Sequence, residues 1–126
     1  MNQELVELQR GSSTGAIILD CMYQDLGQTA YMDASIEDTY LFRYGNPIFK
    51  SKLEQLSSNG KTTYFVIRRI DALITVQQEK YIGLIKDREF MGYSIPSNVI
   101  IVFTVESKES LKNIAPNLYQ LCVVAF

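Results

Sequence analysis

A continuous apolar run, VIIVFTV at residues 99–105, constrains the fold of this chain more than any other segment. A strand with no polar alternation is typical of a parallel sheet, because helices cover both faces of such a sheet. Two further runs, TTYFVI at 62–67 and CVVAF at 122–126, are also free of charged residues. Three such strands in one chain predict an α/β fold rather than an all-β one.

Strand-like and helix-like segments alternate along the chain. We predict strands over residues 5–8, 29–34, 62–67, 99–105 and 122–126, and helices over residues 16–26, 47–58, 76–90 and 110–118. Strict alternation predicts a five-stranded parallel sheet with helices on both faces, which is a three-layer α/β sandwich. A length of 126 residues predicts a single domain over residues 1–126.

Composition excludes several functional classes. The 12 basic and 14 acidic residues give a net charge of −2, so we expect neither a nucleic-acid partner nor an acidic tail. The chain has no histidine, which removes histidine-based triads and zinc motifs, and we expect no metal or other cofactor. Cys21 and Cys122 lie in apolar runs and are predicted to be buried, reduced thiols. The polar amino terminus and the short apolar runs predict a cytoplasmic protein without a membrane span.

The second half of the chain carries a family resemblance. VIRRIDAL (66–73), EKYIGLIKDREFMGYSIPSNVIIVFTVES (79–107) and KESLKNIAPNLYQLCVVAF (108–126) resemble the core of AAA+ ATPases, in particular the MoxR-like and clamp-loader delta-prime types. LVELQRGSSTGAIIL (5–19) is similar to the nucleotide-binding turn of that family only in outline. The resemblance implies a P-loop NTPase fold with strand order 5-1-4-3-2.

The phosphate loop implied by the resemblance is degenerate. That loop has the pattern GxxxxGK[ST] between a strand and a helix, and its backbone amides and lysine hold the phosphates. The corresponding residues are Gly11, Ser12, Ser13, Thr14, Gly15 and Ala16. The turn is one residue shorter than the pattern, Ala16 stands at the lysine position, and Ile17 replaces the hydroxyl residue. A second match, GKTT at 60–63, leaves a helix and enters a strand, so we interpret Gly60 as a helix C-cap.

The hydrolytic residues are degenerate as well. The resemblance places the magnesium-binding and water-orienting acids (the Walker B position) at Arg68 and Arg69, with Asp71 matching a structural acid. Two cations at that place would repel magnesium. The polar sensor position falls at Thr104 to Glu106, and no basic residue stands where the arginine finger is expected.

Three arginines could still bind a ligand or a neighbouring subunit. Arg68 and Arg69 are predicted at the carboxyl edge of the sheet, where α/β folds bind ligands, and they could hold an anion. They could instead be solvated or pair with Asp71 and Glu106. Arg88 could reach a neighbouring subunit, or belong to a surface charge cluster.

These observations predict a non-catalytic AAA+-like domain that acts as a protein-interaction or assembly module. A partner could be an active AAA+ ATPase or replication machinery. The sequence shows no helical lid after the fifth strand, and the surface that a lid would cover makes a homodimer plausible. Two alternatives stay open: a nucleotide-binding ATPase with an atypical phosphate loop, and an anion or nucleic-acid binder using Arg68 and Arg69.

Overall fold

A computed structural model describes residues 16–20, 28–34, 47–90 and 93–125. The strands are β1 (Ala16–Asp20), β2 (Thr29–Asp33), β3 (Thr63–Arg68), β4 (Glu89–Phe90), β5 (Tyr93–Ser94), β6 (Val99–Val105) and β7 (Cys122–Val124). The helices are α3 (Pro47–Ser57), α4 (Thr75–Asp87) and α5 (Pro116–Tyr119), with 3-10 turns η1 (Ile70–Ala72) and η2 (Lys108–Asn113). None of the helices among these residues is long and apolar enough to cross a bilayer.

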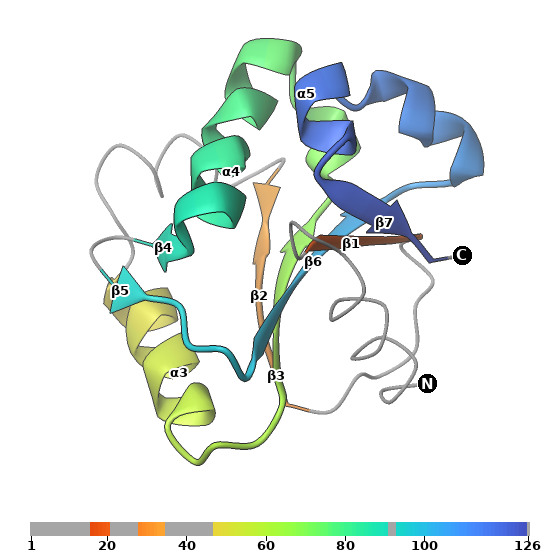
Figure 1. The fold of residues 1–126 in the computed structure, drawn as a ribbon. Coiled ribbons are helices and arrows are strands. Elements are labelled where there is room, and N and C mark those ends of the chain that lie inside the picture. The colour runs from red at the N-terminus through yellow and green to blue at the C-terminus, as the bar shows by residue number, and fades with distance from the viewer. Residues whose placement is uncertain (1–15, 21–27, 35–46, 91–92, 126) are drawn as a thin grey trace.

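Five strands form one parallel sheet in the order β2-β3-β6-β1-β7 (Figure 1). This confirms the predicted α/β class, and the order resembles the predicted 5-1-4-3-2, with residues 16–20 in the place that was predicted for the strand at 5–8. Strands β4 and β5 form a separate antiparallel pair. β6 lies in the middle of the sheet and has the predicted bounds, and all of its residues are buried.

The central strands bury alternate residues on two faces. One cluster joins Ile18, Phe65 and Phe103 with side chains of the helices, among them Leu53 of α3 and Tyr81 of α4. The Tyr81 ring meets the Phe103 ring edge-on, with centroids 6.0 Å apart and an interplanar angle of 89°. Figure 1 shows α3 and α4 on the same side of the sheet.

The opposite face holds a second cluster of buried side chains. It consists of Ile17, Leu19, Tyr64, Val66, Ile100 and Val102, with Ala125 packed against them. Within the described residues, every α-helix contributes its buried apolar side chains to the first cluster and none to this one. The expected third layer of the sandwich therefore remains a prediction.

The predicted helix over residues 16–26 is wrong at its start. Residues 16–20 form β1, which pairs with β6 and β7. Ala16 and Ile18 pack on the first face and Ile17 and Leu19 on the second, so the run is buried on both sides like β6. A short apolar run does not distinguish a helix from such a strand by periodicity. The strand predicted at 5–8 and the remainder of that helix lie outside the described residues.

Two other helices have different bounds from those predicted. The helix predicted at 76–90 ends at Asp87, because Arg88 takes a left-handed conformation with φ 48° and Glu89 begins β4. The helix predicted at 110–118 is divided into η2 and α5, and Pro116 stands at the start of α5, not in a last turn. Proline lacks the N–H that a helix interior needs and fits the first helical position.

Candidate functional site

The carboxyl ends of β3 and β6 bring four of the predicted site residues together. We call Arg69, Asp71, Thr104 and Glu106 the edge cluster. Arg69 follows β3 directly, and its backbone lies in the left-handed region at φ 60° and ψ 44°. Its N–H donates to Oγ1 of Thr104, which is fully buried in β6, at 3.1 Å. This bond fixes the turn that leaves β3 against the neighbouring strand.

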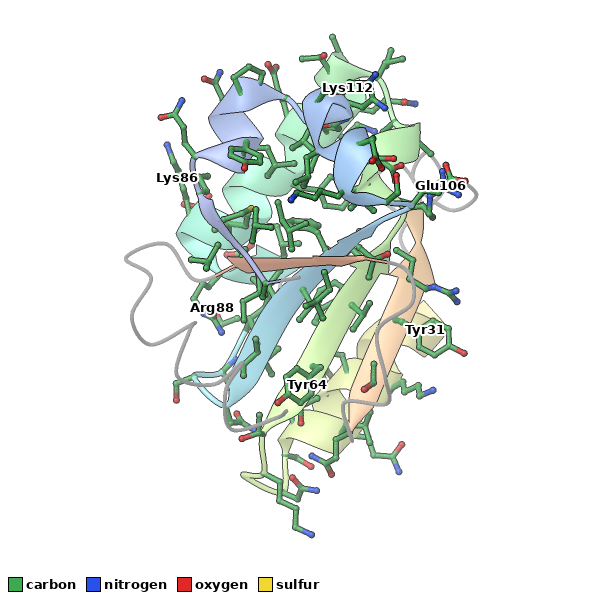
Figure 2. All side chains as sticks on the ribbon, turned by 90° about the vertical axis from the view of Figure 1, so that its right-hand side faces the viewer. Tyr31, Tyr64, Lys86, Arg88, Glu106 and Lys112 are labelled. Atoms are coloured by element: carbon green, nitrogen blue, oxygen red, sulfur yellow. The ribbon has the colours of Figure 1, made fainter. Side chains whose placement is uncertain are left out.

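Asp71 is the centre of the edge cluster. Its side chain is only 3% exposed, and Nε of Arg69 donates to its Oδ1 at 3.1 Å. The N–H of Glu106 donates to Oδ2 of Asp71 at 3.3 Å. Nη2 of Arg69 lies 3.6 Å from Oε2 of Glu106, whose side chain is 66% exposed. Figure 2 shows Glu106 at this end of the strands and Tyr64 toward the other end.

The edge cluster is a satisfied ion-pair network. Both oxygens of Asp71 accept N–H groups of the protein, so a metal ion would have to displace Arg69. This confirms, for Arg69, the interpretation that it pairs with Asp71 and Glu106. Because Arg69 is engaged in this network, the predicted anion site would have to rely on Arg68 alone.

Arg68 lies apart from the edge cluster. Its guanidinium carbon is 5.7 Å from the ring centroid of Tyr31 on β2, and Nζ of Lys52 on α3 is 5.8 Å from the same centroid. Tyr31 is 53% exposed. We call Tyr31, Lys52 and Arg68 the tyrosine patch. Cations near an aromatic ring are attracted by its quadrupole, which holds these two positive charges together.

Arg88 is occupied inside the chain. Nη2 donates to the carbonyl oxygens of Pro96 and Val99, both at 2.8 Å. Burial lowers the pKa of the Arg88 guanidinium. Val99 is the first residue of β6, so these bonds tie the end of α4 to the amino edge of the sheet, opposite the edge cluster. The contacts of Arg88 explain its position without a neighbouring subunit.

The predicted phosphate loop does not have the setting that its chemistry needs. Gly11, Ser12, Ser13, Thr14 and Gly15 lie outside the described residues, and Ala16 is a fully buried residue of β1. The turn therefore precedes a strand, whereas a phosphate loop follows a strand and begins a helix.

The GKTT segment at 60–63 has in part the structure that we inferred for it. Gly60 follows α3 with φ 76°, a conformation that glycine adopts freely, and Thr63 begins β3 as a buried residue. The segment lies at the amino edge of the sheet. The segment therefore connects a helix to a strand as inferred, but α3 ends at Ser57, so Gly60 stands in the turn after the helix and not at its C-cap.

Sequence reasoning missed a groove beside α4 and α5. A larger pocket of about 550 Å³ with a mixed lining includes Ile74, Lys112 and Asn113, and a smaller, more apolar pocket of about 470 Å³ includes Leu111 and Tyr119. Lys112, Ile114 and Pro116 line both pockets. We call this surface the α4–α5 groove, defined by Ile74, Leu111, Lys112, Ile114, Pro116 and Tyr119.

Large apolar side chains are exposed around the α4–α5 groove. Ile74 is 67% exposed and Tyr119 is 41% exposed, and Val76 in the first turn of α4 is 71% exposed. Figure 1 shows the first turn of α4 beside α5. The available signal was Val76, which falls on the side of α4 opposite the buried Tyr81 and Ile85. Ile74 has the spacing of the buried side, and it is exposed because it is the extended residue before the helix begins.

Cys122 is a free thiol, as predicted, and is partly buried. Its Sγ donates to the carbonyl oxygen of Leu118 at 3.3 Å, and burial raises its pKa to about 12. Such a thiol is a poor nucleophile. Cys21 lies outside the described residues.

Comparison of the chain with protein-family models, curated proteins and solved structures found no match. The AAA+ resemblance therefore stays a prediction from the sequence pattern.

Proposed function

We propose that this chain is a non-catalytic, AAA+-like domain that acts as a protein-interaction or assembly module, with an active AAA+ ATPase or replication machinery as candidate partners. The observation that carries the proposal is the α4–α5 groove with its rim of exposed Ile74, Val76 and Tyr119. Soluble proteins seldom expose such side chains together unless another molecule covers them. A homodimer through this surface is one form that the contact could take.

The edge cluster supports the absence of catalysis. A hydrolytic site of the AAA+ type needs an acid free to hold magnesium and another to orient water. In this chain Asp71 is engaged by Arg69 and by the Glu106 N–H. The side chain of Glu106 lies near the Arg69 guanidinium. The charged groups of the edge cluster thus pair with one another and stabilise the fold.

Site-directed photo-cross-linking tests the interaction role. A photoreactive phenylalanine analogue replaces Val76 in the full chain, and the matched control carries it at Lys61, which is exposed in the turn after α3. We expect a discrete cross-linked protein from position 76 and none from position 61, in cells that normally make this chain. Equal labelling at both positions, or no product at position 76, would contradict the proposal.

A second candidate, anion or nucleic-acid binding, is favoured by the tyrosine patch. An exposed ring with two nearby cations can hold a phosphate and a base. The register of the sheet pairs Asp33 with Arg68, so an acidic residue stands at the same end of the two strands. Fluorescence anisotropy with a labelled single-stranded oligonucleotide tests this function. Binding that Arg68→Ala weakens and Arg69→Ala leaves unchanged would support it, and absent or salt-insensitive binding would remove it.

A further inference from the structure

Lys112 gives the α4–α5 groove a specific electrostatic character. It is an exposed residue at the carboxyl end of η2 and lines both the larger pocket and the smaller, more apolar one. Figure 2 shows Lys112 at the top of the molecule, away from the sheet. A ligand that fills both pockets would therefore pass next to this ammonium group.

Lys112 belongs to a segment with one excess positive charge. Asp71 also lines the larger pocket, but the two oxygens of its carboxylate accept N–H groups from Arg69 and Glu106. Hydrogen bonds from its own backbone N–H and from Ser107 lower the pKa of Glu109, and the nearby Lys108 and Lys112 lower it further. With these two lysines and one glutamate, η2 carries one net positive charge. The groove thus offers apolar walls and a cation that one carboxylate could pair with.

We propose that the α4–α5 groove binds a peptide segment of a partner protein in which an acidic residue is flanked by apolar side chains. The carboxylate would pair with Lys112, one apolar side chain would contact Leu111 and Tyr119, and the other would contact Ile74. The inference rests on the proposed interaction function and specifies the chemistry of the partner. Charge complementarity at Lys112 favours such a segment over a purely apolar one, which would leave the excess positive charge of η2 without a second carboxylate.

Peptide display tests the inference directly. Random dodecapeptides on phage are selected against the full chain, against the Lys112→Glu variant and against a matched Lys61→Glu control. Both lysines are exposed, so neither change is expected to disturb folding, which circular dichroism verifies. We expect the wild type and the Lys61→Glu control to enrich peptides that combine acidic and apolar residues. The same peptides should bind the Lys112→Glu variant about tenfold more weakly, because an attraction becomes a repulsion.

The outcomes separate the inference from the proposed function. Enriched peptides without an acidic residue, or acidic peptides that bind the Lys112→Glu variant equally well, overturn the inference and leave an interaction function in place. Failure to enrich any peptide also overturns the inference, as does sedimentation evidence that a second copy of the chain occupies the groove. The proposed function itself is decided separately, by cross-linking at Val76.

Discussion

Gln78 holds α4 to the segment between η2 and α5, and its replacement should destabilise the fold strongly. The side chain is fully buried at 0% exposure. Its Nε2 donates to the carbonyl oxygens of Leu73 and Asn113, both at 2.8 Å, and its Oε1 accepts the Ala115 N–H at 2.6 Å. One side chain therefore satisfies three backbone groups.

Gln78→Met keeps the length and volume of the side chain and removes all three bonds. Each buried backbone group that loses its partner costs about 1–3 kcal/mol. Since neighbouring water can satisfy some of the loss, we expect the free energy of unfolding to fall by about 3 kcal/mol in total. That is a large fraction of the roughly 5–15 kcal/mol of a typical domain.

Urea denaturation followed by far-ultraviolet circular dichroism measures this loss. Gln55→Met is the matched control, because Gln55 is an exposed residue of α3. The control should change the free energy of unfolding by less than about 0.5 kcal/mol. A Gln78→Met variant as stable as the control would refute the argument that these bonds order the groove side of the molecule.

Three further predictions concern single side chains. Arg88→Met should lower the free energy of unfolding by about 2 kcal/mol in urea titrations, because two carbonyl groups lose a charged donor. In a Cys21→Ser variant, Cys122 of the folded protein should react with iodoacetamide at least about a hundred times more slowly than Cys122 of the urea-unfolded protein, because burial raises its pKa to about 12. Equal rates in the two states would show that the thiol is accessible in the fold. The pKa of Glu109 is lowered in the fold by hydrogen bonds from the backbone N–H of Glu109 and from Ser107. The Glu109 carboxylate therefore stabilises the fold above its unfolded pKa, and this contribution is lost as the pH falls through its folded pKa. Glu109→Gln should therefore flatten the stability profile below about pH 4.5, measured by thermal melts at several pH values.

Sequence patterns predict the buried centre of the fold better than its connections. Residues 99–105 form β6 as predicted, because a continuous β-branched run suits a strand covered on both faces. The same property misled the prediction at Ala16–Asp20, where the apolar residues also match a helical period when Cys21 and Met22 are included. The segment is a strand because it pairs with β6 and β7, which lie about a hundred residues further along the sequence. A local periodicity cannot report such a distant pairing.

In the candidate site, too, some features could be predicted from the sequence and others depend on distant contacts. Arg69, Asp71 and Glu106 could be placed together from the order of the strands, since parallel strands share a carboxyl edge. The separation of Arg68 from Arg69 was missed, although successive residues of a strand point to opposite faces and β3 alternates in this way. The α4–α5 groove was beyond prediction, because the exposure of Ile74 and Tyr119 depends on how η2 and α5 pack beside α4.

Isothermal titration calorimetry of the full chain with Mg-ATP tests the central claim, that an AAA+-like sheet persists here without the ability to bind and hydrolyse a nucleotide. We predict no heat beyond dilution at millimolar nucleotide, with the same result for an Arg69→Ala variant, in which Asp71 loses its ion-pair partner. Saturable binding in the micromolar range that requires magnesium would contradict the claim and favour the alternative of a working ATPase.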